Sequence, residues 1–319
     1  MAEKVLLTDH AWSGVEIEQR VLEEAGLELV EAPAGADEEM LLELGGDVSA
    51  IMTNWAPVSR KMIEEASRLR AVVRMGVGLD NIDLQAASDR GCVVSNVPDY
   101  CVEEVSDHVV GFIHSWARGI AAYDREVRGG EWSPGKRQLR RVSELTVGMV
   151  GLGRIGRRSV SKLGALGCRV LGLERPGSPS FDGIELVSRS RMLSLSDVVV
   201  LHVPLNEATY HLVDDRFLAA MRPDALLVNV SRGGVVDTDA LIAGLRVGRP
   251  AWAALDVLES EPEVPPELRE LDNVTLTPHV AFSSDVSVRE LRERASLEVV
   301  HILSGDRPTN RVELPPPRQ

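Results

Sequence analysis

Short apolar segments of strand length alternate with helix-like segments along most of this 319-residue chain. Residues 4–9 (KVLLTD) are typical of a strand. Residues 14–26 follow with Val21 and Leu22 on one helical stripe, which ends at Gly26. Because a connection between parallel strands needs a crossover of about the length of a helix, this alternation predicts a parallel α/β sheet.

The alternation continues as far as residue 279. The further segments expected to form strands are 48–54, 70–76, 145–150, 169–174, 197–203, 225–231, 253–257 and 273–279. A helix is expected at 59–69, and a long one from Glu103 to about residue 130. The polar segment 131–144 then precedes a run of strands and helices typical of a doubly wound nucleotide-binding sheet.

The length and the 44% hydrophobic content are sufficient for two domains of ordinary size. We place the first boundary near residue 102. The last helical stretch, 285–306, is expected to return to the first domain, so that residues 1–102 and 284–319 form one domain and 103–283 the other. The proline-rich end, 313–319, is expected to be a loose tail.

Residues 147–160 (VGMVGLGRIGRRSV) carry the pattern GxGxxG at Gly151, Gly153 and Gly156. Such a pattern indicates a dinucleotide site only between a strand and a helix, with an acidic residue ending the next strand. The expected strand, the expected helix and Glu174, 18 residues beyond Gly156, meet these conditions. Gly151 would allow the sharp turn, Gly153 the approach of a pyrophosphate to the helix N-terminus, and Gly156 close helix–strand packing.

Glu174 favours NAD as the cofactor, because its carboxylate would accept hydrogen bonds from the ribose hydroxyls and repel a 2′-phosphate. The neighbouring Arg175 keeps NADP open as an alternative, since it could pair with that phosphate, stack on adenine or remain a solvated charge. Arg154 and Ile155, inside the glycine turn, are further candidate contacts to the cofactor.

The composition argues against several other kinds of partner. The chain has 49 acidic and 35 basic residues, a net charge of -14 and no long basic run, so nucleic acid is not an expected partner. Cys92, Cys101 and Cys168 are odd in number and lack any metal-ligand spacing. We therefore expect the protein to reside in a reducing cytosol and to hold no structural metal. Without a signal peptide or a membrane span, the protein is expected to be cytoplasmic and not to bind membranes.

Three titratable or charged residues follow apolar strands in the second half of the chain. Arg232 lies in 228–241 (VNVSRGGVVDTDAL), Glu261 in 253–262 (AALDVLESEP) and His279 in 276–284 (LTPHVAFSS). Ligands of parallel sheets bind outside the carboxyl ends of the strands, so these three side chains could converge on one crevice. Each also has a simpler interpretation, as a surface charge or a strand-end residue.

Together with 77–83 (VGLDNID) and 96–100 (NVPDY), these stretches resemble the D-isomer-specific 2-hydroxyacid dehydrogenase family over about residues 48–312. The segment 205–212 (LNEATYHL) is most similar to the branch of C-terminal-binding-protein-like and phosphoglycerate dehydrogenase-like members. The resemblance implies two Rossmann-like, doubly wound parallel-sheet domains, with the NAD-binding Rossmann domain (103–283) inserted into a flavodoxin-like, substrate-binding domain. It also implies hydride transfer between NADH and a small 2-keto or D-2-hydroxy acid.

The resemblance assigns the catalytic set to Arg232, Glu261 and His279. His279 would donate a proton to the carbonyl oxygen as hydride arrives and take it back in the reverse direction. Glu261 would orient the ring and raise the His279 pKa by stabilising the imidazolium. The planar fork of Arg232 would bind the substrate carboxylate and polarise the keto oxygen.

The same resemblance implies contacts to substrate and cofactor. The backbone amides of Val77 and Gly78 would bind the substrate carboxylate, while Arg74 would bind a second anionic group or form an ordinary salt bridge. The candidates for the pocket wall are Asn54, Trp55, Tyr100 and Phe282. The further candidates for the cofactor site are His202, Pro204, Thr209, Val230 and, at the nicotinamide amide, Asp256.

Residues 116–132 resemble the helix and arm through which family members dimerise. The apolar side chains of Ile113, Trp116 and Ile120 favour burial in such an interface over exposure to solvent. A homodimer is therefore expected, with a solvent-exposed long helix as the alternative. A second alternative is an NAD(H)-sensing, corepressor-like protein with little or no turnover, because a fold alone does not fix a function.

Overall fold

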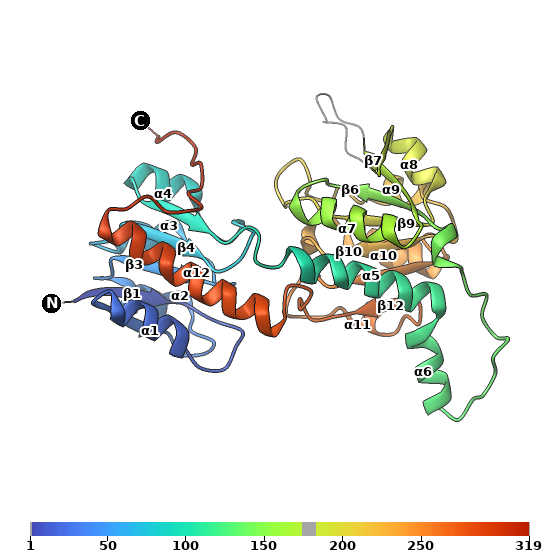
Figure 1. Cartoon of the computed structure of the whole chain (residues 1–319), viewed down its shortest axis with the longest axis horizontal. Helices are drawn as coiled ribbons and strands as arrows, with labels where there is room; N and C mark the ends of the chain where they lie inside the picture. Colours follow the sequence, from blue (N-terminus) through green and yellow to red (C-terminus); the bar gives the residue numbers. More distant parts are fainter. Residues whose placement is uncertain (1, 174–182, 319) are drawn as a thin grey trace. The chain divides into compact units, whose positions relative to one another are not determined.

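The computed structural model describes residues 2–173 and 183–318, and the chain forms two compact units (Figure 1). Unit 1 comprises Met1–Tyr100 and Ser284–Gln319, and unit 2 comprises Cys101–Ser283. Glu174 and Arg175 lie outside the described residues. Within the described ranges, no helix is long and apolar enough to cross a membrane.

Unit 1 is built on a five-stranded parallel sheet in the order β2-β1-β3-β4-β5. This is the order of flavodoxin-like sheets, in which the winding reverses between β1 and β3. Its elements are β1 (Glu3–Leu7), α1 (Glu16–Glu24), β2 (Leu27–Glu31), α2 (Glu38–Gly45), β3 (Ala50–Thr53), α3 (Arg60–Glu65), β4 (Ala71–Arg74), α4 (Leu84–Arg90), β5 (Val93–Asn96) and α12 (Asp285–Ser304).

Unit 2 contains, over its described residues, a seven-stranded parallel sheet in the order β12-β11-β10-β9-β6-β7-β8, whose winding reverses between β6 and β9. Its first elements are α5 (Val102–Arg118), α6 (Ile120–Arg128), η1 (Val142–Glu144), β6 (Thr146–Val150), α7 (Arg154–Ala165), β7 (Arg169–Leu173), β8 (Glu185–Val187) and α8 (Arg189–Leu195). The remaining elements are β9 (Val198–Leu201), α9 (Asp215–Ala220), β10 (Leu226–Asn229), η2 (Gly233–Val235), α10 (Thr238–Arg246), β11 (Trp252–Leu255), α11 (Pro266–Arg269) and β12 (Val274–Leu276).

Both faces of the unit 2 sheet are buried, as the continuous apolar runs predict. In β9, Val198 and Val200 pack into one core cluster with α5 and α7, whereas Val199 and Leu201 pack into another with α8, α9 and α10. Alternate strand residues point to opposite faces, so two clusters mean a helical layer on each side of the sheet (Figure 1). The predicted fold class, two doubly wound parallel-sheet α/β units, is confirmed.

The prediction of a single long helix over 103–130 is wrong, because the helix ends at Gly119 and a second helix follows. Gly119 adopts the left-handed conformation at φ 64°, ends α5 and precedes α6. Ile113, which we expected at a dimer interface, is instead fully buried in the unit 2 core. Trp116 is half-buried, and the Arg140 guanidinium lies 4.9 Å above its ring.

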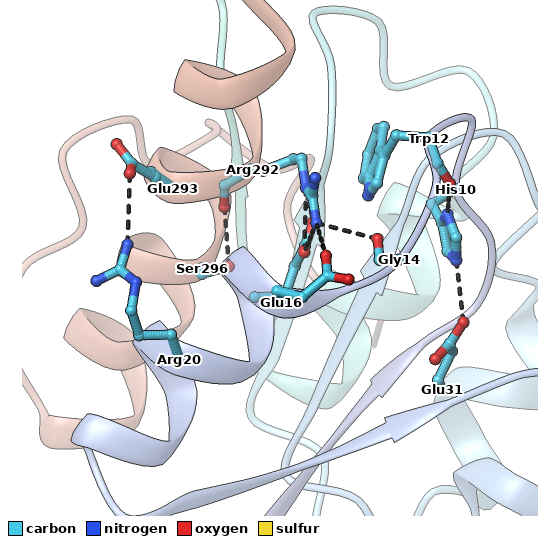
Figure 2. Close-up of polar contacts among 10 residues, drawn as sticks. His10, Trp12, Gly14, Glu16, Arg20, Glu31, Arg292, Glu293 and Ser296 are labelled. Atoms are coloured by element: carbon cyan, nitrogen blue, oxygen red, sulfur yellow. Dashed lines mark hydrogen bonds and ion pairs between the residues drawn. The ribbon is translucent and has the colours of Figure 1, made fainter.

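Helix α12 returns to unit 1 and packs beside α1 (Figure 1). A capping box at Ser284 starts the helix. The guanidinium of Arg292 forms bidentate hydrogen bonds of 2.7–3.1 Å with the fully buried carboxylate of Glu18 on α1. Figure 2 shows the same guanidinium donating to the carbonyl of Gly14, with the Trp12 ring beside it.

The expectation of a loose tail at 313–319 is wrong for the described residues of that segment. Leu314 packs against the core of unit 1. The Pro315 carbonyl accepts a hydrogen bond from the Ser88 hydroxyl, and the Pro316 carbonyl accepts one from Gln85. Proline retains its carbonyl as an acceptor, so side chains of α4 can hold a proline-rich segment in place.

Candidate active site

The glycine turn lies between β6 and α7, at the point where the winding of the unit 2 sheet reverses. Gly151 has φ 107°, and a Cβ there would lie 2.4 Å from the carbonyl oxygen of His202, just after β9. A Cβ on Gly156 would lie 2.3 Å from the carbonyl oxygen of Gly151. These two glycines therefore let the turn, the helix and the neighbouring strand approach each other closely.

Gly153, at the N-cap of α7, has no neighbouring heavy atom within 4 Å of where its Cβ would be. The turn is thus tight on its protein side and open at the helix N-terminus, where backbone N–H groups favour a phosphate. This geometry fits the pyrophosphate of a dinucleotide. In the first turn of α7, Arg154 is exposed and Ile155 is half-buried.

Four other predicted cofactor residues of unit 2, His202, Pro204, Thr209 and Val230, lie on the loops after β9 and β10. Burial lowers the pKa of His202 to about 4, and its Nε2 lies 3.1 Å from the hydroxyl of Ser159 on α7. The Thr209 hydroxyl donates to the carbonyl of Pro204 over 2.6 Å, which closes the loop after β9. Val230, half-buried, follows β10 directly.

His279 and Glu261 form a hydrogen-bonded pair. The Nδ1 atom of His279 lies 2.7 Å from Oε2 of Glu261. The second oxygen of Glu261 accepts a hydrogen bond from the Leu258 amide, also over 2.7 Å. An ionised carboxylate only accepts, so Nδ1 carries the proton and Nε2 is the basic nitrogen of the neutral ring.

The charge of Glu261 is favoured by its surroundings. Burial raises the pKa of the carboxyl, but the hydrogen bond and charge of His279, the Leu258 amide and the charge of Arg232 outweigh it. They hold the pKa of Glu261 below its ordinary value. Glu261 therefore remains a carboxylate at neutral pH and can stabilise a positive charge on the His279 ring.

Arg232 lies beside this pair because three neighbouring strands end together. Arg232 follows β10, Glu261 follows β11 and His279 follows β12, and these strands are consecutive in the sheet. At Gly233 a Cβ would lie 1.9 Å from the carbonyl of Leu258, so only glycine lets the Arg232 turn meet the Glu261 loop. The structure thus brings the three residues into one cluster.

His279 occupies a backbone conformation that few residues adopt. Its φ is 51°, in the left-handed region. Its amide donates to the carbonyls of Asp256 and Thr277, and its ring lies 6.3 Å, edge to face, from that of Phe282. The buried carboxylate of Asp256 accepts from the amides of Val280 and Ala281. Asp256 thereby holds the segment just after His279.

The predicted substrate residues of unit 1 form a separate set of loops. Asn54 is buried, and its side-chain amide donates to the carbonyl of Met75 over 2.8 Å. Trp55 is 40% exposed. Arg74 is only 6% exposed, and its guanidinium also donates to the Met75 carbonyl. Asn54 and Arg74 thus meet at one carbonyl, just before the loop of Val77.

The loop of Val77 and Gly78 follows β4, and both residues are half-buried. Asn96, at the end of β5, donates to the Val77 carbonyl over 2.8 Å. Gly76, one residue earlier, has φ 154° and lies against the Arg74 guanidinium, where a Cβ would be 2.3 Å from Nη1. Tyr100, the last residue of the first segment of unit 1, is buried.

Comparison with known proteins identifies the family. The model of the D-isomer specific 2-hydroxyacid dehydrogenase NAD-binding domain matches residues 110–281. A glyoxylate reductase of Thermococcus litoralis is 34% identical over 297 residues, which are 90% of this chain and 90% of that protein. The chain belongs to the D-isomer-specific 2-hydroxyacid dehydrogenase family.

Solved structures share the whole fold of this dehydrogenase. A Thermus thermophilus protein superposes with a TM-score of 0.90 at 30% identity, covering 97% of this chain and all of that one. A D-lactate dehydrogenase of Aquifex aeolicus, solved with NAD and lactic acid, gives 0.87 at 27% identity over 98% and 99% of the two chains. The predicted family and enzyme class are confirmed: the protein is an NAD(P)-dependent oxidoreductase acting on 2-keto or 2-hydroxy acids.

Two side chains of this dehydrogenase, Asp9 and His108, support the predicted residues but were not predicted from the sequence. In unit 1, Asp9 accepts hydrogen bonds from the amides of Asn54 (2.9 Å) and Trp55 (2.7 Å). In unit 2, His108 contacts the Thr277 hydroxyl. For Asp9, position along the chain is a sequence signal. Asp9 lies two residues beyond β1, at the reversal of the unit 1 sheet, where ligand loops are expected.

Proposed function

We propose that this dehydrogenase reduces small 2-keto acids, with His279 as the acid–base residue, Glu261 as its partner and Arg232 as the carboxylate ligand. The observation that carries the proposal is the 2.7 Å contact between His279 Nδ1 and Glu261 Oε2, with Arg232 close to the same carboxylate. A proton donor paired with a fixed carboxylate, next to a cation, is what reduction of an anionic keto acid requires.

In the direction of reduction, the His279 imidazolium would release its Nε2 proton to the substrate carbonyl oxygen. Glu261 stabilises the imidazolium before that transfer and still accepts the hydrogen bond from the Nδ1–H group afterwards, so the ring stays in one orientation. Arg232 offers two parallel N–H donors, which suit a carboxylate and an adjacent keto oxygen better than the single ammonium of lysine does. In oxidation of the hydroxy acid, His279 takes the proton back.

Bound NADH would supply the hydride. For this chain we propose that unit 2 holds the dinucleotide at the turn from Gly151 to Gly156, with His202, Thr209 and Asp256 on the surrounding loops. Unit 1 would bind the substrate through Asn54, Trp55 and the Val77–Gly78 amides, with Arg74 on the same Met75 carbonyl as Asn54. The open position at Gly153 supports the first assignment, and the cross-linked loops after β3 and β4 support the second.

The substrate class follows from relatives and from local chemistry. The Thermococcus litoralis relative is a glyoxylate reductase. Arg232 in unit 2 has the planar donors that suit a carboxylate. We therefore propose a small monocarboxylic 2-keto acid, such as glyoxylate, as the preferred substrate class. A preference for an acid with a second anionic group would instead assign the binding of that group to Arg74.

We further propose that the dehydrogenase is a homodimer assembled through α6 and the segment after it. Ile120 is 57% exposed and Trp132 is 85% exposed, and Val127, between them in the sequence, is 47% exposed. A cavity of about 360 Å³, lined in part by Trp116 and Trp252, opens beside this helix. Apolar side chains this exposed favour coverage by a second copy. Light scattering on the wild type and on Trp132→Ser would test it.

A cytoplasmic location remains our proposal. Cys92 and Cys168 are buried free thiols, and Cys101 is buried as well. Buried thiols that form no disulfide bond fit a reducing compartment. Labelling of the protein in intact cells and fractionation of those cells would decide the location.

The test is NADH oxidation by the purified protein with monocarboxylic, dicarboxylic and phosphorylated 2-keto acids, and NADPH in parallel. We expect turnover with a small monocarboxylic acid, and its loss in His279→Ala with NADH affinity retained. Unchanged turnover in His279→Ala would refute the acid–base assignment. Tight NADH binding without turnover of any acid would favour the sensing protein over the reductase.

The cofactor preference has its own test. Glu174→Ala should weaken NADH binding and narrow the preference for NADH over NADPH, because a ribose-binding carboxylate would be lost. Arg175→Ala serves as the neighbouring control, and it would weaken NADPH binding only if Arg175 contacts a 2′-phosphate. An undiminished preference for NADH in Glu174→Ala would mean that another residue binds the ribose.

A further inference from the structure

His108 on α5 belongs to a hydrogen-bonded chain that ends at the His279 turn. Its Nε2 lies 3.1 Å from the hydroxyl oxygen of Thr277. The Thr277 hydroxyl donates to Oδ1 of Asp256 over 2.5 Å. Asp256 accepts from the amides of Val280 and Ala281 over 2.9 and 3.0 Å. All of these residues belong to unit 2.

The direction of the hydrogen bonds follows from the number of protons. A hydroxyl has one proton, and Thr277 gives it to Asp256, so the Thr277 oxygen can only accept from His108. The His108 Nε2 atom must therefore carry a proton. Burial lowers the pKa of His108, against the opposing effect of the Asp256 charge, which makes the neutral ring with its proton on Nε2 the species that donates.

The carboxylate at the end of this chain holds a backbone that would otherwise relax. His279 has φ 51°, which residues with side chains rarely adopt, and Asp256 binds the two amides that follow it. The Asp256 carbonyl also accepts from the His279 amide over 2.8 Å. The orientation of the Asp256 carboxylate is thus coupled to the position of the His279 ring.

We propose that His108 is a positioning residue of this dehydrogenase, which fixes the Thr277 hydroxyl and, through Asp256, the backbone turn that presents His279. The proposal rests on the acid–base function of His279 proposed above. It adds a residue from the first helix of unit 2, more than 160 residues away in the sequence, to the catalytic machinery. His108 touches none of the reacting groups, so its loss should lower kcat through the turn that carries His279.

Packing is the competing explanation, because the His108 ring also lies edge to face on Phe112, with centroids 4.4 Å apart. Substitutions separate the two roles. His108→Leu keeps apolar volume and loses the donor, whereas His108→Gln keeps an N–H donor near the position of Nε2. His108→Asn has the same amide on a shorter side chain that does not extend to Thr277.

The experiment measures kcat, KM, NADH affinity and Tm for these variants, for Thr277→Val and for the double variant His108→Leu/Thr277→Val. We expect kcat to fall about tenfold in His108→Leu and His108→Asn and to recover in His108→Gln, with Tm close to that of the wild type. The double variant should lose no more than Thr277→Val alone, because both act through one chain. His114→Leu, on the same helix, is the matched control and should retain wild-type kcat.

Three results would overturn the proposal. One is a wild-type kcat in His108→Leu, and another is additive losses in the double variant. The third is a His108→Leu variant whose Tm falls together with kcat and a His108→Gln variant that restores neither, which would show a packing role. Failure of the proposed function is a different result, because then the wild type itself would not turn over any 2-keto acid.

Discussion

Gly156 and Gly151 approach each other so closely that a Cβ on Gly156 would lie 2.3 Å from the Gly151 carbonyl oxygen. Gly153, between them in the sequence, has open space at the same position. Two of the three motif glycines, Gly151 and Gly156, are therefore required by packing within the protein, while Gly153 leaves room for a ligand. Mutation can separate these two requirements.

Gly156→Ala should lower Tm by several degrees, since the helix must move away from the turn to accept the methyl group. Gly153→Ala should leave Tm near wild type, because φ is -72° there and nothing obstructs the methyl group. It should nevertheless weaken NADH binding about tenfold or more, by occupying the place of a phosphate. Thermal unfolding and NADH fluorescence titration measure both effects, and equal NADH affinity in Gly153→Ala and wild type would contradict the assigned site.

Glu261→Gln should lower kcat for keto-acid reduction roughly 10²-fold with little effect on NADH affinity, because the amide cannot stabilise the His279 imidazolium. The pKa of Glu261 is held below its ordinary value of 4.5. The carboxylate's contribution is therefore complete above that value and is lost only as the pH falls through the lowered pKa. Stopped-flow reduction between pH 4 and 8 should show this group still ionised near about pH 4.5, and an acid limb centred above its ordinary pKa would argue against the pair.

His202 should make the stability of the fold depend on pH between its ordinary pKa of 6.5 and its lowered pKa of about 4. Its pKa of about 4 in the folded protein lies below the ordinary 6.5, so the unfolded chain binds the proton first as the pH falls. Stability should begin to fall below about pH 6.5. The part of the stability that depends on the neutral His202 ring, roughly 3 kcal/mol, should be fully lost near pH 4. Urea unfolding of wild type and His202→Gln at several pH values measures it. Equal pH slopes would show that the ring is not buried as a neutral group.

Glu18→Ala should destabilise unit 1 by about 3–5 kcal/mol, because it leaves the Arg292 guanidinium buried without its carboxylate. The double variant Glu18→Leu/Arg292→Leu should recover much of this loss. The matched control is Glu293→Ala, which removes the exposed partner of Arg20 seen in Figure 2 and should have little effect. Chemical denaturation would measure all three, and equal effects of Glu18→Ala and Glu293→Ala would refute the expected difference.

Asp9→Ala should raise the KM for the keto acid about tenfold while kcat and NADH affinity stay close to wild type. Its two carboxylate oxygens hold the amides of Asn54 and Trp55, and their loss would free the loop that we assign to the substrate. Asp9→Asn retains one acceptor oxygen and should have a smaller effect. A change in NADH affinity instead of KM would show that Asp9 does not act through this loop.

The sequence allowed correct prediction of those parts of the fold that depend on local pattern. Strand-length apolar runs and helical spacing are set by neighbouring residues, so the two parallel sheets followed from them. Arg232, Glu261 and His279 could be proposed as a cluster because each follows a strand, and parallel strands end at one edge. Their meeting in the structure reflects the adjacency of β10, β11 and β12.

What depends on distant contacts was not predictable. The helical pattern continues through Gly119, and only the structure shows that this residue turns left-handed and ends the helix. The tail at 313–318 contains prolines that suggest disorder, yet Ser88 and Gln85 of α4 hold its carbonyls. Asp9 and His108 act on residues 45 and 169 positions away, and no local spacing records such pairs.

The return of α12 to unit 1 sets the order in which the two units can be completed on the ribosome. Leu291, Ala295 and Val299 of α12 are fully buried in unit 1, so that core stays unfinished until the last part of the chain has emerged. Unit 2, one continuous segment, has all of its residues much earlier. Although unit 1 contains the first residues of the sequence, we therefore expect it to fold after unit 2. Its β-strands would stay partly uncovered until α12 has been synthesised.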